Sequence, residues 1–518
     1  MSMTQSLKRS LQQTPDAIVA REGERHLSFS QFGDRVARLA GALRKLGVKR
    51  GDRVAMLSLN STRYLEYFLA VPWAGGALNP CNIRWSVKEV TYSLDDSQST
   101  VLIVDDAHAA VGAEIAALAK TVRTVIHAGD GPAPAGMLSY EALITGTDPV
   151  EDAGLAPSDM AGIFYTGGTT GFPKGVVLSH LNLWASSMCY LLEGMFPEGV
   201  VYLHAAPMFH LADLGMTVAV FLRGGTHAIV PGFTPQGVTD ALVAHGVTDM
   251  LLVPTMIQML ADHPGIAPVR DRLRVKRLVY GASPISEAVL ERAMVAMPGV
   301  QFMQVYGMTE LSPLATCNGF YNHSPEGRAA GKLRAAGRAT FGVEVRIVDP
   351  EGREVPRGTV GEVIVRGPNV MQGYWNLPEQ TVAALRDGWM HTGDGAWMDA
   401  DGYVFIADRL KDMIISGGEN VYSTEVENVL AQHPAVAACA VIGVPSERWG
   451  EAVHAVVVLK PGQAATADEL RAHCKAFIAG YKCPAQVEFR EGLPLSGAGK
   501  ILKTELRKPY WERKGENN

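Results

Sequence analysis

The chain has 518 residues, of which 47% are hydrophobic and 19% charged, and its formal net charge at pH 7 is −6. This length is too great for one compact core, so we expect two or more domains. The composition excludes a disordered or fibrous protein, and the acidic balance argues against a nucleic-acid scaffold, which usually carries a basic face.

The cysteines and the first residues indicate a cytoplasmic protein. The six cysteines are scattered, without the paired spacing of a zinc site or a dense disulfide framework, so we expect reduced thiols. Residues 1–21 are polar and lack the apolar core of a signal peptide. The most apolar early stretch, residues 64–78, is short and interrupted by Pro72 and two glycines, so we expect no transmembrane segment.

The first 160 residues alternate helical and strand patterns. Apolar residues at helical spacing over 32–46 predict a helix, and Gly47 stands where a helix C-cap is expected. Residues 54–59 and Val101–Val104 are predicted to form short buried strands. Such alternation favours an α/β sheet with crossover helices.

The pattern changes twice further along the chain. From about Phe341 it is β-rich, with strands predicted at 343–348 and 362–366. Beyond residue 408, capping boxes predict helices starting at Thr424 and Thr466, and strands are predicted at 437–442 and 454–459. We therefore divide the chain into a large domain, residues 1–408, and a small α+β domain, residues 409–518.

The most informative segment is the phosphate loop, residues 165–176, with the sequence YTGGTTGFPKGV. Its glycines allow backbone N–H groups to face an anion, its threonines add hydroxyl donors, and Lys174 adds a charge suited to a polyphosphate. A surface turn without a ligand has nearly the same composition, so the segment alone leaves both readings open. The segment also lacks the Gly-Lys-Ser/Thr ending of a P-loop NTPase, so that fold is not implied.

Other side chains suited to a nucleotide stand in later segments. Tyr306 offers an aromatic face for a purine, and Glu310 offers a carboxylate for a hard cation. Asp394 suits the hydroxyls of a ribose, and Lys500 would offset repulsion between two anionic reactants. Taken singly, these residues are more typical of a core aromatic, a helix start, a turn and a surface lysine.

Together, and in this order, these segments resemble the motifs of the adenylate-forming superfamily. This family includes acyl-CoA synthetases, firefly luciferases and adenylation domains of peptide synthetases. Gly167 stands where the family usually has serine, a variation similar to that of some fatty-acyl-CoA ligases. The resemblance reaches Lys500 and implies a multidomain α/β fold: sheets flanked by helices, a β-rich subdomain and a small mobile C-terminal domain, with ATP bound between the domains.

The resemblance implies a role for each segment. The triphosphate would contact the phosphate loop, at Thr166, Gly167, Gly168, Thr169, Thr170, Gly171 and Lys174. The adenine would contact small, polar and aromatic residues, namely Gly281, Ala282, Ser283, Gln304, Tyr306 and Gly307. Asp394 and Arg409 would bind the ribose, and Thr309 the α-phosphate. Glu310 and Thr166 would hold Mg²⁺, and the catalytic set would be Lys500, Glu310, Thr166 and His210.

The acceptor of the activated acid is less directly indicated. Residues 416–421, which include Gly417, Gly418 and Glu419, resemble the loop that lines the pantetheine tunnel, and Lys411 occupies the hinge position. Trp449 and Tyr481 resemble residues that flank the adenine of CoA, although a packed surface aromatic is an equally good interpretation of Trp449. Because no carrier-protein segment follows Lys500, we expect free CoA to be the acceptor.

The acid itself would bind in an apolar pocket. His210 resembles the residue that gates the carboxylate, and the pocket would be lined by Met216, Val305, Met308, Leu311 and Leu314. Asp213 would either orient His210 or bond nearby backbone, and the second is favoured. The apolar lining suits a medium- or long-chain fatty acid or an aryl acid such as a cinnamate and does not separate them; we predict the fatty acid.

We therefore predict an AMP-forming acyl-CoA ligase that uses ATP, Mg²⁺ and CoA. It would form an acyl-adenylate and pyrophosphate, then an acyl-CoA and AMP. The alternatives are an aryl- or hydroxycinnamate-CoA ligase, an enzyme that loads a separate carrier protein, and a non-catalytic nucleotide- or acyl-binding protein. No nucleic acid is expected as a partner, and a homodimer is compatible with the sequence.

Overall fold

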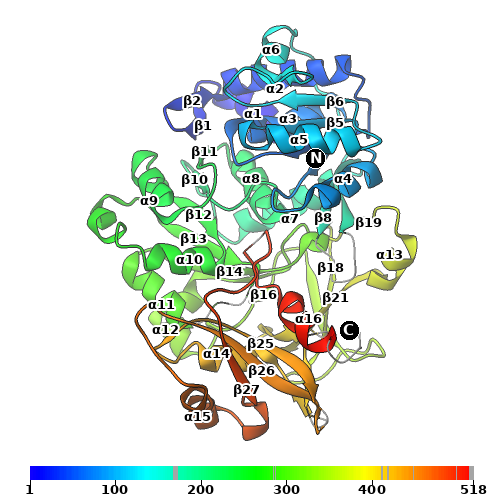
Figure 1. Ribbon diagram of the computed structural model, residues 1–518. Helices are drawn as coiled ribbons and strands as arrows, with labels where there is room; N and C mark the ends of the chain where they lie inside the picture. The colour runs from blue at the N-terminus through cyan, green and yellow to red at the C-terminus, as the bar shows by residue number, and fades with distance from the viewer. Residues whose placement is uncertain are drawn as a thin grey trace.

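The computed structural model describes residues 1–166, 173–283, 285, 287–409, 412–416, 419–446, 448–497 and 499–512, with the backbone alone for Arg409. Across these residues the strands form four sheets, of nine, eight, five and five strands. In Figure 1 the C-terminal sheet lies at the bottom, below the two larger sheets and their helices. The predicted multidomain α/β fold is confirmed.

The eight-stranded sheet has the order β19-β9-β8-β4-β3-β5-β6-β7 and is parallel from β8 to β7. Its strands are β3 (Arg53–Leu57), β4 (Ala77–Pro80), β5 (Val101–Val104), β6 (Thr124–His127), β7 (Leu138–Ser139), β8 (Met160–Thr166), β9 (Lys174–Ser179) and β19 (Gly373–Tyr374). The helices along this part of the chain are α2 (Phe29–Lys45), α3 (Thr62–Ala74), α4 (Val87–Asp96), η1 (Asp106–His108), α5 (Ala109–Leu118) and α6 (Tyr140–Thr145). All four residues of β5 are buried, because helices cover both faces of such a sheet.

The nine-stranded sheet has the order β16-β15-β14-β13-β12-β10-β11-β1-β2. Its strands are β1 (Ile18–Glu22), β2 (Arg25–Ser28), β10 (Val201–His204), β11 (Thr226–Ile229), β12 (Asp249–Leu252), β13 (Arg277–Gly281), β14 (Gln301–Tyr306), β15 (Thr316–Asn318) and β16 (Arg338–Ala339). Its helices are α1 (Thr4–Gln13), α7 (His180–Leu192), α8 (Leu211–Arg223), α9 (Pro235–Ala244), α10 (Pro254–Ala261), η2 (Ala267–Arg272), α11 (Glu287–Ala296), η3 (Thr309–Leu311), η4 (Phe320–His323) and α12 (Pro325–Ala329).

The β-rich region that the sequence predicts after residue 341 is a five-stranded sheet. It contains β17 (Glu344–Val348), β18 (Gly361–Arg366), β20 (Leu385–Arg386), β21 (Trp389–Met398) and β22 (Val404–Arg409), with α13 (Pro378–Ala384) beside it. Both predicted strands, 343–348 and 362–366, agree with β17 and β18 within one residue.

The C-terminal region has its own sheet and helices. Its elements are β23 (Ile414–Ser416), β24 (Glu419–Val421), α14 (Ser423–Leu430), β25 (Val436–Ser446), β26 (Gly450–Leu459), α15 (Ala467–Phe477), η5 (Gly480–Lys482), β27 (Gln486–Phe489) and α16 (Lys503–Glu512). The predicted strands at 437–442 and 454–459 lie inside β25 and β26. This α+β composition agrees with the prediction for the small domain.

Helix ends test the local predictions most directly. Gly47 follows α2 and has φ +95°, a conformation that favours glycine, as predicted for a C-cap. Thr466 caps α15 in the predicted capping box with Glu469. The predicted box at Thr424 is wrong, because α14 already begins at Ser423 and Glu427 instead accepts a hydrogen bond from Val441 and pairs with Lys503.

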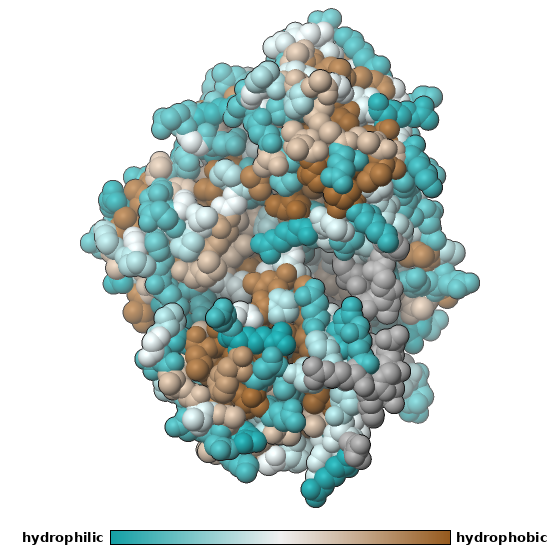
Figure 2. All heavy atoms as spheres, viewed as in Figure 1, coloured by the Kyte–Doolittle hydropathy of each residue, from teal (hydrophilic) through white to brown (hydrophobic). Residues whose placement is uncertain are grey.

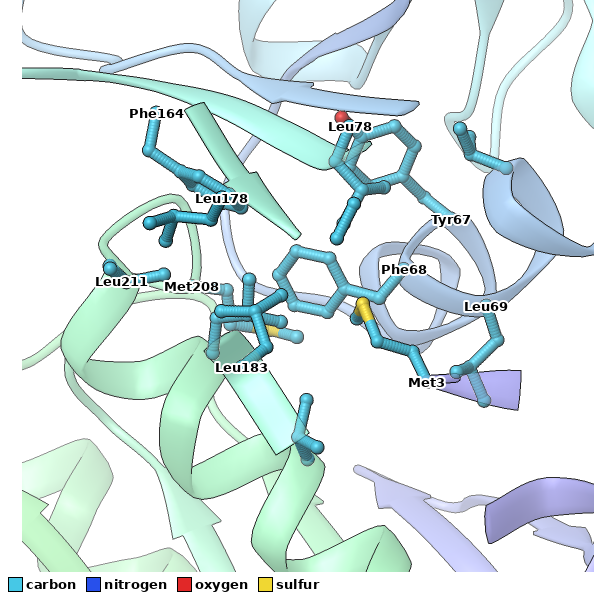
Figure 3. Close-up of a cluster of buried hydrophobic side chains, with 14 of the residues drawn as sticks. Met3, Tyr67, Phe68, Leu69, Leu78, Phe164, Leu178, Leu183, Met208 and Leu211 are labelled. Atoms are coloured by element: carbon cyan, nitrogen blue, oxygen red, sulfur yellow. The ribbon is translucent and has the colours of Figure 1, made fainter. Parts of the chain in front are cut away.

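One apolar core joins the two large sheets, and the C-terminal region has a separate core. In Figure 3, Phe68 of α3 lies next to Leu183 of α7 and Met208, so helices that cover different sheets pack together. The separate core at the C-terminus includes Ile414 and Leu470. This separation supports the division that we propose near residue 408.

The surface fits a globular protein. Figure 2 shows a face covered mainly by hydrophilic side chains, with apolar patches between them. All six cysteines are free thiols, in agreement with the sequence prediction. Within the described part of the chain, no helix combines the length and the apolar character that crossing a membrane requires.

Candidate active site

The two ends of the phosphate loop lie next to each other on a hairpin. Residues 167–172, which include Gly167, Gly168, Thr169, Thr170 and Gly171, lie outside the described residues. Thr166 ends β8 and pairs with Lys174, which begins β9. The ammonium of Lys174 lies 5.3 Å from the centre of the Tyr374 ring. The hairpin thus presents a hydroxyl and a cation at the point where the loop begins and ends.

The predicted metal ligand is connected to this hairpin through Tyr374. Glu310 lies in η3 and is 6% exposed, and its Oε1 accepts a hydrogen bond of 2.8 Å from the Tyr374 hydroxyl. Tyr374 belongs to β19, which pairs with β9. Burial and the Glu310 carboxylate raise the pKa of Tyr374, so its hydroxyl remains a donor. No motif pointed to Tyr374, because its position beside Glu310 depends on strand pairing.

The oxygen ligands at Glu310 and Thr166 suit Mg²⁺ when a nucleotide supplies further oxygen ligands. In the described ranges, no three His, Cys, Asp or Glu side chains gather as a metal cage. Mg²⁺ is commonly held by one or two carboxylates plus the phosphates of its substrate. Glu310 offers one such carboxylate, and the Thr166 hydroxyl adds a neutral oxygen. These residues therefore suit a magnesium ion that arrives with ATP.

The residues expected to bind adenine and ribose are in contact. The Tyr306 hydroxyl, at the end of β14, donates a hydrogen bond of 2.7 Å to Oδ2 of Asp394 in β21. Asp394 is 5% exposed and pairs along the backbone with Arg409 of β22. Strand pairing thus places Asp394 beside Arg409, and a contact between two different sheets brings Tyr306 to Asp394.

The small residues near Tyr306 allow close approach of backbone segments. A Cβ atom added to Gly281 would lie 2.4 Å from the Val305 carbonyl oxygen, and one on Gly307 would lie 1.9 Å from the Pro313 carbonyl oxygen. Neither position has room for a side chain. Ala282 has φ +68°, and with Ser283 it continues the turn after β13. These contacts explain why glycine stands at positions 281 and 307.

Gln304 lies beside Tyr280, whose hydroxyl is oriented by His323, and the sequence analysis identified neither residue. The Tyr280 hydroxyl lies 3.4 Å from Oε1 of Gln304 and 2.8 Å from Nε2 of His323. Nδ1 of His323 donates to the Gly319 carbonyl. Burial lowers the pKa of His323 to about 4, so its Nε2 remains an acceptor near neutral pH.

His210 and Lys500 lie close enough to interact electrostatically. His210 is the N-cap of α8, and its Nδ1 accepts a hydrogen bond from the Ala212 N–H. Burial first, and the positive charge of Lys500 second, lower the pKa of His210 to about 4. The imidazole is therefore neutral near pH 7, beside a cation from the C-terminal region.

The segment that carries Lys500 rests on the large domain. Ser496 and Lys500 close a tight turn through hydrogen bonds of 2.7 and 3.1 Å. Arg84 donates to the Ser496 carbonyl at 2.9 Å, and a Cβ on Gly497 would lie 2.5 Å from Asn82. In Figure 1 the red segment before α16 extends upward to the middle of the molecule. The turn thus delivers Lys500 to the vicinity of His210.

The prediction for Asp213 is wrong, because its carboxylate bonds neither His210 nor the nearby backbone. Oδ2 of Asp213 lies 2.7 Å from Nδ1 of His204, and Oδ1 accepts from the Tyr202 hydroxyl at 3.1 Å. Both partners belong to β10, against which α8 packs, so the helix faces them only in the folded chain. All three side chains are fully buried.

The predicted acyl pocket is divided between two apolar clusters. Met216, Val305 and Leu314 pack in one cluster with Phe196 and Cys317. Leu311 and Met308 pack instead in the main core. Thr309, the predicted contact of the α-phosphate, is the first residue of η3.

The residues expected to contact CoA lie on the small domain or outside the described residues. Lys411, Gly417 and Gly418 lie outside them. Glu419 begins β24 and is exposed. Trp449 and Tyr481 are 47% and 48% exposed. A cation lies over each ring, Arg448 at 4.6 Å and Lys482 at 5.8 Å.

Buried histidines make stability depend on pH. Burial lowers the pKa of His180 and of His323 to about 4, below the value of about 6.5 in an unfolded chain. The unfolded state therefore binds protons first as the pH falls. Each histidine, by staying neutral in the folded state, contributes up to about 3 kcal/mol to the free energy of unfolding. This contribution is fully present above pH of about 6.5 and is lost as the pH falls towards about 4.

We expect the midpoint temperature of thermal unfolding to decrease as the pH is lowered from about 6.5 to about 4. In the His323→Gln variant this decrease should be smaller. Calorimetry across the pH range measures both. A midpoint that stays constant through the window would contradict the assignment.

Comparison with known proteins gives a consistent result. Residues 7–375 match the AMP-binding enzyme family, and residues 425–500 match the C-terminal domain of AMP-binding enzymes. A feruloyl-CoA synthase of an Amycolatopsis species is 41% identical, over 97% of this chain and 98% of that protein. A fatty acid–[acyl-carrier-protein] ligase of Streptomyces coeruleorubidus is 38% identical, over 94% and 92%. The crystal structure of ATP-bound MatB from Rhodopseudomonas palustris superposes with a TM-score of 0.88, at 31% identity over 98% and 99%.

Proposed function

The chain belongs to the AMP-binding enzyme family, as an AMP-forming acyl- or aryl-CoA ligase, and we propose that its acid is a medium- or long-chain fatty acid. A carboxylate oxygen attacks the α-phosphorus of ATP, and the bond to the bridging oxygen breaks as pyrophosphate leaves. The thiol sulfur of CoA then attacks the acyl carbon, the thiol proton is lost, and AMP leaves. The observation that carries this proposal is the apolar cluster that contains Met216 and Leu314.

The site residues have distinct proposed roles. Lys500 offsets the repulsion between the attacking carboxylate and the α-phosphate. Tyr306 stacks on the adenine while its hydroxyl orients Asp394 toward the ribose. Glu310 and Thr166 would hold Mg²⁺, which would neutralise charge on the phosphates. Thr309 contacts the α-phosphate, and neutral His210 borders the carboxylate without adding a charge that would compete with Lys500.

The proposed acid follows from the apolar cluster beside this site. Met216 and Leu314 are fully buried and pack with Val305, Phe196 and Cys317. Such a wall favours a hydrocarbon chain over a polar one, since burial of apolar surface is favourable. Gly167 supports the same choice through its resemblance to fatty-acyl ligases. An aryl acid is the second candidate, because a relative of 41% identity is a feruloyl-CoA synthase.

The acceptor is proposed to be free CoA. The exposed rings of Trp449 and Tyr481, each with a cation over it, offer surfaces that suit an adenine and its phosphates. A carrier-protein thiol is the alternative, because one relative is named as a fatty acid–[acyl-carrier-protein] ligase. We propose that Lys411 acts as the hinge between the two half-reactions.

A pyrophosphate-release assay tests the acid and the acceptor together. Saturated fatty acids of increasing chain length are compared with cinnamate and ferulate, each with ATP, Mg²⁺ and CoA. We expect the highest kcat/KM for a medium- or long-chain fatty acid, with acyl-CoA as product. Higher kcat/KM for ferulate would overturn the choice of acid. Pyrophosphate release with thioester formed only on a phosphopantetheinylated carrier protein would overturn free CoA as acceptor.

A further inference from the structure

We propose that Lys503 is a positioning residue for adenylation, because it ties the segment that carries Lys500 to Asp408 at the end of the large domain. The connection is the Lys503 cluster, formed by Lys503, Glu427, Ser423 and Asp408. This inference rests on the proposed two-step function, and it concerns residues outside the nucleotide and acyl sites.

The Lys503 cluster is a continuous set of polar contacts. Lys503 is the first residue of α16, and its Nζ lies 2.7 Å from Oε1 of Glu427 and donates to Oγ of Ser423. The backbone N–H and the hydroxyl of Ser423 both donate to Oδ2 of Asp408, at 2.6 Å each. The Val441 N–H also donates to Glu427, at 2.8 Å.

The cluster is well shielded from water. Ser423 is fully buried, Asp408 is 5% exposed, and the side chains of Lys503 and Glu427 are 15% and 17% exposed. Burial lowers the pKa of the Lys503 ammonium. The carboxylates of Glu427 and Asp408 raise this pKa by a larger amount, so it lies above its usual value. Lys503 therefore remains a cation between two carboxylates, and its loss would leave them close together without a counter-charge.

The position of the cluster in the chain gives it a role beyond stability. Asp408 lies in β22, next to Arg409, whose backbone pairs with Asp394 of the candidate ribose site. Lys503 lies three residues after Lys500. One turn further along α16, Arg507 pairs with Asp412. Helix α16 is thus linked to Asp408 through Ser423 and pairs directly with Asp412, on the other side of the proposed domain boundary.

The other end of the Lys500 segment is held by the large domain. Arg84 donates to the Ser496 carbonyl, and Gly497 packs on Asn82. Lys500 therefore lies between two anchors, the large domain on one side and the Lys503 cluster on the other. Displacement of a catalytic group by about 1 Å can cost a factor of about a hundred in rate. An anchor three residues away is close enough to set its position.

The Lys503→Met variant tests this inference, because methionine keeps the apolar stem and removes the charge. We expect pyrophosphate exchange, which reports adenylation, to fall by about ten- to a hundredfold. Thioester formation from a synthetic acyl-adenylate and CoA should fall by less than about threefold, because this half-reaction does not need Lys500 at the phosphate. Lys503→Arg, which keeps the cation, should recover part of the exchange rate.

Two controls separate positioning from a loss of folding. Lys508→Met changes the same helix at a side chain that is 70% exposed and paired with Glu512, and both half-reactions should stay within about twofold of wild type. In a Lys500→Ala background, Lys503→Met should slow exchange by less than about twofold, because two residues that act as a unit are not additive.

The outcomes are distinct. Equal losses in both half-reactions, or a full additional loss in the Lys500→Ala background, would overturn the inference. If Lys503→Met does not fold, Ser423→Ala serves instead, because it removes the hydroxyl that joins Lys503 to Asp408. This variant should slow exchange severalfold and leave thioester formation unchanged. Equal effects on both half-reactions would overturn the inference. Wild-type protein without either half-reaction would overturn the proposed function instead.

Discussion

Replacing Lys500 by alanine is expected to slow acyl-adenylate formation by about a hundredfold or more while ATP binding stays nearly intact. Loss of one electrostatic group aimed at the transition state typically costs a factor of this size. ATP would still be held by the proposed contacts to its adenine, ribose and phosphates, at Tyr306, Asp394 and Lys174. The rate effect should therefore appear in kcat for adenylation rather than in the affinity for ATP.

Pyrophosphate exchange and direct titration with ATP measure the two quantities separately. Lys508→Ala is the matched control, since it removes an exposed lysine from the neighbouring helix. Because the charge of Lys500 contributes to the low pKa of His210, the Lys500→Ala variant should also raise the pKa of His210, as followed by NMR. Exchange at the wild-type rate in Lys500→Ala would exclude the proposed mechanism.

Replacing Glu310 by glutamine is expected to lower adenylation by about a hundredfold at limiting Mg²⁺ and to raise the Mg²⁺ concentration that the reaction requires. Glutamine keeps the shape of the side chain and its acceptor for Tyr374, but it removes the charge that suits a hard cation. A bound metal contributes several kcal/mol to stabilising charge on a phosphoryl group, and each 1.4 kcal/mol corresponds to about tenfold in rate.

Tyr374→Phe is the matched control, because it removes the hydrogen bond to Glu310 and keeps the carboxylate. We expect it to lower the rate by less than about tenfold, with little change in the Mg²⁺ requirement. Exchange rates measured across a range of Mg²⁺ concentrations distinguish the two variants. An unchanged Mg²⁺ dependence in Glu310→Gln would argue that another group holds the metal.

The sequence predicted well those features that depend on neighbouring residues. The C-cap at Gly47, the strand Val101–Val104 and the capping box at Thr466 are all confirmed. In each case the hydrogen bonds or the burial pattern involve residues a few positions apart. The failed prediction at Thr424 shows the limit, because Glu427, its predicted partner, accepts from the Val441 N–H and pairs with Lys503 instead.

The sequence also predicts which side chains carry the chemistry, since the motifs stand in family order and include Lys174, Glu310, Asp394 and Lys500, and these roles stay predictions. It could not identify the residues that hold them. Tyr374 beside Glu310, Tyr280 beside Gln304 and His204 beside Asp213 belong to no motif. Their side chains are common core residues, and nothing in their local sequence marks them.

By itself, then, the sequence determined the fold class, the order of the motifs and the family, because periodic patterns and short motifs are properties of neighbouring residues. Only the tertiary structure decided the hydrogen-bond partners, since a contact between two different sheets joins Tyr306 to Asp394 and an ion pair between two helices joins Lys503 to Glu427 across long separations in the chain. A polar side chain removed from water must bond whatever partner the fold places beside it. That partner is set by the register of strands and the packing of helices, which no local pattern encodes.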